Sequence, residues 1–245
     1  MKSMYIVAAC AAALAASAVA ATVPPNIAAA VANTNRPQAD RDRDAARKPA
    51  EVLAFAGVKP GDTVLELIPG GGYFTRVLSG AVGPTGHVTE AVPQRGGADV
   101  KQTSNGVAAD PNFKNVSEMA LSPDTLGKAG PVDVVWTSQN YHDLHLSQLK
   151  LDVVAIDKQV YAALKPGGVF FIEDHAAKAG DATAPDKLHR IDEAVVKQEV
   201  ESAGFKLVGE SDVLHNPADD HTLLVFNPAI RGHTDQFLLK FQKPR

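Results

Sequence analysis

Two short segments of the chain carry the side chains best suited to chemistry, residues 140–145 and residues 173–175, and each places a histidine beside a carboxylate. Histidine exchanges its proton near neutral pH, so it can act as a general base, and an adjacent carboxylate can orient its ring. The ring of Tyr141 could stack on a flat substrate or cofactor. The predicted catalytic residues are His142, His175, Asp143 and Tyr141, with Glu173 and Asp174 as further orienting carboxylates.

The same side chains could instead bind a metal ion. Ligand types for zinc or another divalent ion are supplied by His142, Asp143, His145, Asp174 and His175. The spacing between His142 and His145 matches no specific metal-binding signature. A metal-dependent enzyme is therefore an alternative interpretation, and no residue is predicted as a metal ligand.

Both segments directly follow predicted strands of an alternating pattern. The predicted strands are residues 63–68, 87–92, 115–120, 132–137, 169–173 and 205–213, the predicted helices are residues 51–56, 73–81, 146–164 and 188–203, and a final β-rich stretch ends at residues 237–241. Strands that alternate with helices indicate an α/β fold with a mainly parallel sheet. Because the carboxyl ends of parallel strands lie at the same edge, this sheet would bring both segments to one rim.

A glycine-rich turn separates the first strong strand from the next helix. Gly70, Gly71 and Gly72 follow the apolar run at residues 63–68, and helical periodicity starts at Tyr73. Glycine lets the backbone adopt positive φ and approach a ligand closely. The first turn of a helix also offers free N–H groups to an anion or carboxylate. The turn is therefore predicted to be part of a ligand site.

The order of these motifs resembles that of the class I S-adenosylmethionine-dependent methyltransferases. In that family an acidic residue, here Glu66, precedes a glycine-rich turn after the first strand. Further segments look like the family's fourth strand, its turn into the fifth, its entry into the sixth and its terminal strand, namely residues 132–136, 164–172, 203–205 and 238–244. The resemblance implies a Rossmann-like, doubly wound, mainly parallel seven-stranded sheet with an antiparallel C-terminal strand. More narrowly, the chain resembles a group of exported, methyltransferase-like bacterial proteins.

The resemblance also implies S-adenosylmethionine (SAM) as the cofactor. The matching binding residues are Glu66, Gly70, Gly71, Gly72, Glu90 and Asn140. Two positions depart from the family, because Ile68 stands where the first glycine is usual and Val92 matches the acidic residue that usually binds the ribose hydroxyls. Glu90 lies two residues before Val92 on the same strand face and could substitute only if the strand end shifts. Glu118 is the nearest match to the family's acidic residue for the adenine amino group.

The N-terminus has the layout of a secretory signal. Lys2 precedes an apolar run at residues 4–16 and a small-residue stretch at 17–20, which predicts cleavage after Ala20 or Ala21, export to the periplasm and no stable membrane insertion afterwards. A membrane anchor is an alternative, although the run is shorter than the roughly 20 apolar residues of a spanning helix. Lipidation at Cys10 is a second alternative, since small residues precede it.

Composition narrows the class of partner. The 245 residues carry a net charge of −4, which excludes the basic footprint of a general nucleic-acid binder. The single cysteine, Cys10, excludes disulfide scaffolds, cysteine zinc sites and cysteine nucleophiles. A small-molecule substrate is expected, with the oligomeric state left open. The predicted organisation is a signal peptide at 1–20, a loose leader with a surface helix at 21–49 and one α/β domain at 50–245.

Three functions are compatible with these patterns. The first is an exported SAM-dependent methyltransferase acting on a small molecule or an envelope component, the second a non-catalytic ligand-binding protein on the same fold, and the third a metal-dependent enzyme. Ile68 and Val92 motivate the second.

Two further side chains have expected positions. Arg190 is expected either to pair a substrate carboxylate or phosphate or to form a surface ion pair with Asp192 or Glu193. Trp136 is expected in the core.

Overall fold

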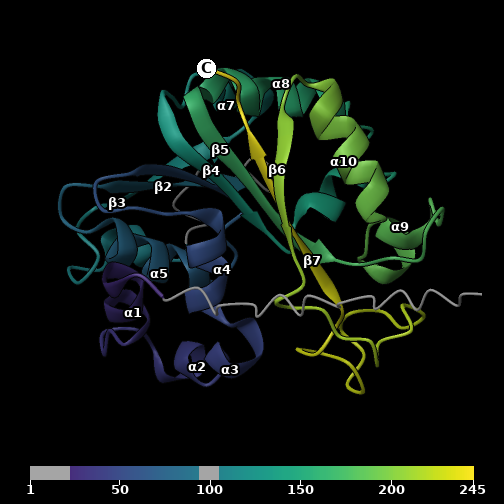
Figure 1. The fold of residues 1–245 in the computed structure, drawn as a ribbon, viewed down its shortest axis with the longest axis horizontal. Coiled ribbons are helices and arrows are strands. Elements are labelled where there is room, and N and C mark those ends of the chain that lie inside the picture. Colours follow the sequence, from purple (N-terminus) through teal and green to yellow (C-terminus); the bar gives the residue numbers. More distant parts are fainter. Residues whose placement is uncertain (1–22, 94–104) are drawn as a thin grey trace, which may run out of the picture.

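The computed structural model describes residues 23–93 and 105–245, which are built around one seven-stranded sheet (Figure 1). The strand order is β3-β2-β1-β4-β5-β7-β6. β7 runs antiparallel to both of its neighbours, while the pairs among β1 to β5 are parallel. The predicted fold, a doubly wound and mainly parallel sheet with an antiparallel C-terminal strand, is confirmed.

The strands and helices have the following bounds. The strands are β1 Thr63–Leu67, β2 His87–Pro93, β3 Val116–Leu121, β4 Val132–Ser138, β5 Leu164–His175, β6 Lys206–Ser211 and β7 Gln236–Gln242. The helices on the first half of the chain are α1 Pro25–Val31, α2 Gln38–Arg41, α3 Asp44–Arg47, α4 Pro49–Ala56, α5 Tyr73–Val82 and the short 3-10 turn η1 Val107–Ala109. Those on the second half are α7 Pro123–Leu126, η2 Tyr141–His145, α8 Val153–Ala163, α9 Ala184–Leu188 and α10 Glu193–Ser202.

The two central strands, β1 and β4, have nearly continuous buried sequences. Burial is unbroken from Val64 to Leu67 in β1 and from Val134 to Thr137 in β4. Strands with helices on both faces have such runs, because neither side meets water. Glu66 is the exception within β1, a carboxylate in a buried strand, and its register partner on β2 is Glu90. The sheet therefore places two buried carboxyl groups side by side.

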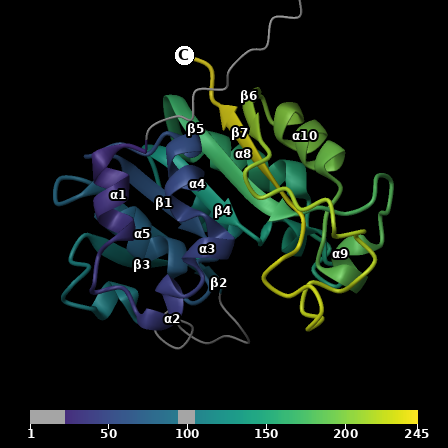
Figure 2. The same ribbon diagram turned by 60° about the horizontal axis from the view of Figure 1, so that its bottom comes forward.

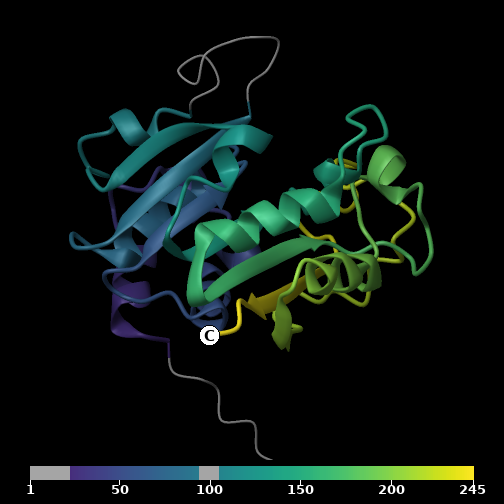
Figure 3. The same cartoon turned by 90° about the horizontal axis from the view of Figure 1, so that it is seen from above.

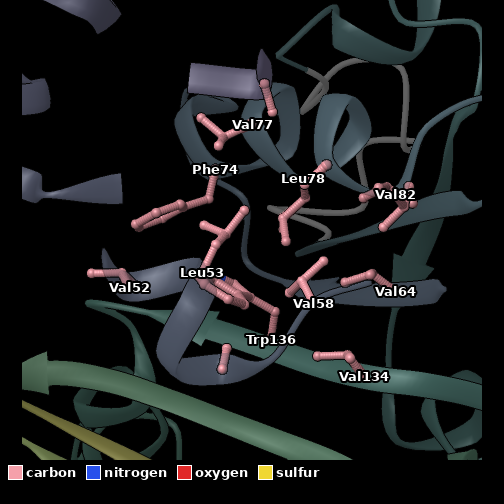
Figure 4. Close-up of a cluster of buried hydrophobic side chains, with 14 of the residues drawn as sticks. Val52, Leu53, Val58, Val64, Phe74, Val77, Leu78, Val82, Val134 and Trp136 are labelled. Atoms are coloured by element: carbon pink, nitrogen blue, oxygen red, sulfur yellow. The ribbon is translucent and has the colours of Figure 1, made fainter. Parts of the chain in front are cut away.

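Helices cover both faces of the sheet (Figure 1, Figure 3). On one face, α4 and α5 contribute Leu53 and Phe74 to a buried cluster that includes Trp136 of β4 (Figure 4). On the other face, α8 and α10 pack against residues such as Val135. Trp136 is fully buried and stacks on Phe171 with ring centroids 4.1 Å apart, so its predicted core position is confirmed.

The described part of the predicted leader packs on the domain. Ile27 and Ala30 of α1 are buried, and a methyl group added at Gly80 of α5 would lie only 2.9 Å from the Ala30 Cβ. α2 and α3 continue from there toward the end of the sheet at which β1 and β4 terminate (Figure 2). The apolar residues of α1 thus share the core of the domain, whereas α2 and α3 contact α5 through the polar side chains of Asp40 and Asp44.

Part of the chain lies outside the described residues. Residues 1–22 and 94–104 belong to it, and with them the predicted signal peptide, its cleavage site and Cys10. Within the ranges 23–93 and 105–245, no helix is long and apolar enough to cross a membrane.

A long segment connects β6 to β7, residues 212–235, and it contains no strand although the sequence predicts a β-rich stretch there. Arg190 is fully buried and holds the segment, since its Nη1 lies 2.8 Å from Asp219 Oδ2 and its Nε donates to the Leu223 carbonyl oxygen at 3.0 Å. Both roles expected for Arg190, substrate pairing and a surface ion pair, are therefore wrong. A buried guanidinium needs a complete set of partners, and a segment distant in sequence supplies them.

Candidate functional site

A cavity of about 220 Å³ lies at the carboxyl ends of β1 and β4. Its lining residues are Arg43, Arg47, Glu66, Ile68, Pro69, Gly70, Gly71, Tyr73, Phe74, Ser138, Gln139 and Asn140. The structure therefore brings together four residues of the predicted cofactor set, Glu66, Gly70, Gly71 and Asn140. The Asn140 side chain donates to the Ile68 carbonyl oxygen at 2.9 Å and so ties the glycine turn to the loop after β4.

Arg47 brings a positive charge to this cavity from α3. Its guanidinium lies over the rings of Tyr73 and Phe74, 4.3 and 4.6 Å from their centroids. Its Nη2 donates to Ser138 Oγ at 2.9 Å and lies 3.9 Å from a carboxylate oxygen of Glu173. Its Nε is buried and has no hydrogen-bond partner among the described residues. A buried donor without a partner beside a cavity favours an acceptor that comes from a ligand.

Side-chain contacts with α5 fix the helices that carry Arg47. Asp40 accepts a hydrogen bond from Arg76 Nη1 at 2.9 Å, and Asp44 accepts one from the Tyr73 hydroxyl at 2.6 Å. Arg47 is not among the residues predicted from the sequence, because its charged stretch has the pattern of a loose leader. No local signal would have identified it, since alternating charges look the same in a solvated segment and in one that pairs with a distant helix.

Two buried carboxyl groups share one hydroxyl beside the cavity. Thr75 Oγ1 lies 2.6 Å from Glu66 Oε2 and 2.8 Å from Glu90 Oε1. Burial raises the pKa of Glu66 to about 8, against the opposing effect of the Thr75 hydroxyl and with a smaller contribution from the charge of Glu90. The Thr75 hydroxyl has one proton and donates it to one of the two carboxyl groups at a time. With a pKa of about 8, Glu66 is protonated at neutral pH when the cavity holds no cation.

The two departures from the family are visible in the backbone and in the burial. Ile68 has φ of +53°, in the left-handed region where a β-branched residue is strained and glycine is not. Val92 is buried and apolar, so it cannot accept a hydrogen bond from a ribose hydroxyl. Glu90 is buried as well, and it accepts a hydrogen bond from Asn105 Nδ2 at 2.6 Å. Its Oε2 has no hydrogen-bond partner among the described residues.

The glycines of the turn have different roles, which a pair of substitutions tests. Gly72 has φ of +77°, and an added Cβ would lie 2.5 Å from Val107 Cγ2, whereas an added Cβ at Gly71 meets nothing within 4 Å. We expect Gly72→Ala to lower the free energy of unfolding by about 2 kcal/mol through strain and overpacking. Gly71→Ala should stay within about 0.5 kcal/mol of wild type. Denaturant titrations of both variants measure the difference, and equal losses would contradict this assignment.

The second group of predicted catalytic residues meets at the ends of β4 and β5, where the sequence places it. His142 is buried, with its Nδ1 2.8 Å from Asp174 Oδ1, and its backbone N–H donates to Asp174 Oδ2 at 2.7 Å. Burial would lower the pKa of His142, but the negative charges of Asp174 and Asp143 outweigh it and raise the pKa. Asp174 thus orients the ring of His142. Glu173 instead accepts a hydrogen bond from Ser138, on the side of the cavity.

Two other predicted catalytic residues lie in surroundings that do not suit their expected roles. The Tyr141 ring is buried in the core, and its hydroxyl donates to Asp157 at 2.8 Å, so it has no free face for a ligand. The His175 Nδ1 lies 2.7 Å from the Thr234 hydroxyl, and burial lowers the pKa of His175 to about 3. Such a histidine is neutral and is a weak base at neutral pH.

Comparison with known proteins finds solved structures that resemble this chain in fold. No protein-family model and no curated protein matches the sequence. A SAM-dependent methyltransferase from Aquifex aeolicus matches with a TM-score of 0.59 at 18% identity, over 84% of this chain and 95% of that one. The fibrillarin of Aeropyrum pernix, solved with natively bound S-adenosyl-L-methionine, matches with a TM-score of 0.50 at 17% identity, over 81% and 76%. The [4+2]-cyclase SpnF matches with a TM-score of 0.57 at 18% identity, over 86% and 84%.

The match to the Aquifex aeolicus protein covers 84% of this chain, which is nearly all of its described part. With identities of 18% or less, they are likenesses of fold. The chain therefore has the class I fold of the SAM-dependent methyltransferases.

Proposed function

We propose that the protein binds SAM and transfers its methyl group to a small molecule or an envelope component. The observation that carries the proposal is the presence of a guanidinium and a carboxyl group on one cavity. Arg47 lies on one side, with a buried Nε that lacks a partner, and Glu66 lies on another, next to the glycine turn. The amino-acid end of SAM carries a carboxylate and an ammonium on adjacent atoms, which is the charge pattern that this cavity complements.

The residues present fit that end of the cofactor. Arg47 would hold the carboxylate through its free Nε, and Glu66 would hold the ammonium once it loses its proton. Gly70 and Gly71 leave open space, since an added Cβ at either would meet nothing within 4 Å. SAM supplies a methyl group on a sulfonium, which needs an acceptor atom placed in line with it. Glu90, in the middle of β2, is the proposed partner for the ribose in place of the residue at Val92.

The acceptor would lie on the side of His142. Its ring is oriented by Asp174, which makes His142 the better of the two predicted general bases, while the pKa of about 3 counts against His175. We also propose that the chain acts outside the cytoplasm, in the periplasm, after removal of residues 1–20. The support is the apolar run with small residues before Ala20 and the resemblance to exported methyltransferase-like proteins.

Calorimetry with three ligands tests the cofactor assignment. We expect SAM and S-adenosylhomocysteine to bind the purified protein, and methylthioadenosine, which lacks the amino-acid end, to bind about 100-fold more weakly, because the ion pairs with Arg47 and Glu66 are lost. Equal affinity for the three ligands would contradict the role of the cavity, and the absence of any binding would contradict the proposal.

A non-catalytic ligand-binding protein is the second candidate function. Val92 at the usual ribose position supports it, and the match to a [4+2]-cyclase indicates that this fold also serves reactions other than methyl transfer. Transfer of a labelled methyl group from SAM to any component of an envelope extract would rule it out. SAM binding without such transfer, across extracts from the protein's own compartment, would favour it.

A further inference from the structure

Three ligand atoms converge at the rim next to His142. They are His142 Nε2, His189 Nδ1 and a carboxylate oxygen of Asp143. His142 Nε2 lies 3.3 Å from His189 Nδ1 and 3.4 Å from Asp143 Oδ1, and these last two atoms lie 3.7 Å apart. The residues come from η2 and from the C-terminal end of α9, 47 positions apart in sequence for the two histidines.

Two of these three separations match those around a small divalent cation, and the third, 3.7 Å, is slightly longer. Ligands bound at about 2.0–2.1 Å in a tetrahedron around zinc lie about 3.3–3.4 Å from one another. All three atoms can carry a free lone pair, since His142 Nδ1 directs its proton to Asp174 and the Asp143 carboxylate has no proton to give. Without a cation, one ring N–H can lie between His142 Nε2 and His189 Nδ1, which are 3.3 Å apart, and a bound cation would take the place of that proton. A zinc ion has the size, charge and ligand preference for that position.

The surroundings of His142 are those of a metal-bound histidine. Histidine ligands commonly donate their other ring N–H to a carboxylate, which fixes the tautomer and the ring orientation. Asp174 does this for His142, and it is itself held by the backbone N–H groups of His142 and His175, both at 2.7 Å.

The cluster is also open to solvent on one side. The side chains of Asp143 and His189 are each 31% exposed, so an ion can enter. Three protein ligands leave a fourth position free, the arrangement of catalytic rather than structural zinc sites. His189 adopts φ of +51°, and its ring lies 5.1 Å from that of Phe226, which is more than half exposed. An exposed aromatic ring therefore lies next to one of the three ligand side chains.

We propose that His142, Asp143 and His189 bind one zinc ion with an open coordination position. The site is distinct from the cavity at Arg47 and Glu66, and the proposal does not depend on SAM binding. In the zinc-bound protein His142 is a ligand and cannot accept a proton. The ion would then take over the role proposed for this histidine, because it lowers the pKa of a bound hydroxyl or water.

Equilibrium dialysis of the full chain, purified without a polyhistidine tag, tests the site. We expect the wild-type protein to bind one zinc ion per chain and its cobalt(II) form to show the strong visible absorption of four-coordinate cobalt. His189→Ala and Asp143→Asn change half-buried surface side chains, and each should weaken zinc binding at least 100-fold. Asp174→Asn, which removes the orienting carboxylate, should weaken it about 10- to 100-fold. His233→Ala, which changes an exposed histidine of residues 212–235, is the matched control and should bind as wild type does.

The outcomes separate this proposal from the proposed function. Zinc binding that is absent from the wild-type protein, or equal in His189→Ala, Asp143→Asn and wild type, would overturn the site. Calorimetry with SAM on the same samples reports the other cavity, so a loss of zinc with unchanged SAM affinity supports a separate metal site. Thermal unfolding of each variant in the presence of a chelator checks that the loss of zinc does not result from unfolding.

Discussion

Replacing Arg47 with methionine should lower the affinity for SAM by about 100- to 1000-fold. Methionine keeps an unbranched apolar side chain but removes the guanidinium that lies over the Tyr73 and Phe74 rings, so a bound carboxylate would lose its charge-assisted hydrogen bonds in a buried setting. The loss also removes the positive charge beside Glu173. Calorimetry with SAM measures the change, and it should appear mainly as faster dissociation.

Two further variants show whether the loss of SAM affinity comes from the guanidinium of Arg47. Arg47→Lys keeps the charge without the fork of donors, so we expect an affinity between those of wild type and Arg47→Met. Arg231→Met removes an exposed arginine from residues 212–235 and should leave the affinity unchanged. An Arg47→Met protein that unfolds as wild type does and still binds SAM with wild-type affinity would show that α3 does not hold the ligand.

Glu66→Gln should make the protein more stable at pH 8 and should abolish part of the pH dependence of folding. The pKa of Glu66 is raised from 4.5 to about 8 because the group is buried. The folded state therefore prefers the protonated form. The stability that this provides is complete below the unfolded pKa and is lost as the pH rises through the folded one. Between about pH 5 and pH 8 the free energy of unfolding falls by roughly 3 kcal/mol because of this group. Glutamine does not ionise, so the variant lacks this decrease.

The quantity to measure is the difference in the free energy of unfolding between wild type and Glu66→Gln at each pH. Burial also raises the pKa of Glu173 and of Asp157, each to about 7, so these groups add to the wild-type slope. His175 acts in the opposite direction, since its lowered pKa costs stability as the pH falls below its usual value near 6.5. The difference cancels these contributions. Glu51→Gln, on an exposed side chain of α4, is the control and should follow wild type, and a Glu66→Gln curve parallel to wild type would refute the raised pKa.

The same titration has a consequence for binding. An ammonium group next to Glu66 stabilises its ionised form, so SAM binding at neutral pH should release a proton from a group that is protonated in the ligand-free protein. The affinity for SAM should accordingly rise with pH until it levels off near the pKa of about 8. Calorimetry in buffers of different ionisation enthalpy counts the protons, and Glu66→Gln should show no release from this group.

The strands were the most predictable part of the fold, and the helix starts the least. The predicted strand at 132–137 matches β4 closely, because a continuous apolar run has few alternatives to a buried strand. The predicted helix at 146–164 begins only at Val153, where the Asp152 side chain accepts a hydrogen bond from Ala155 N–H and caps it. The predicted strand at 169–173 begins earlier than expected, at Leu164. Caps and strand extensions depend on neighbours that periodicity does not reveal.

Some residues of the candidate site could likewise be predicted from the sequence, and others could not. Glu66, Gly70 and Gly71 could be found from the strand and glycine pattern, since their neighbours in sequence are their neighbours in space. Arg47 could not, because its value lies in a contact with Ser138, 91 positions away. His189 was missed for a similar reason, since only the return of the chain after β5 brings it to His142.

The sequence by itself determined the architecture. Local hydrophobic patterns predict the order of buried strands and covering helices, and few folds are compatible with that order. It also determined where a site would form, since parallel strands end at a common edge. Only the tertiary structure decided which charges face that edge. Long-range packing places Arg47 and Glu66 on one cavity. It also brings His189 to His142 and Asp143 at the rim. Local sequence patterns do not predict either arrangement.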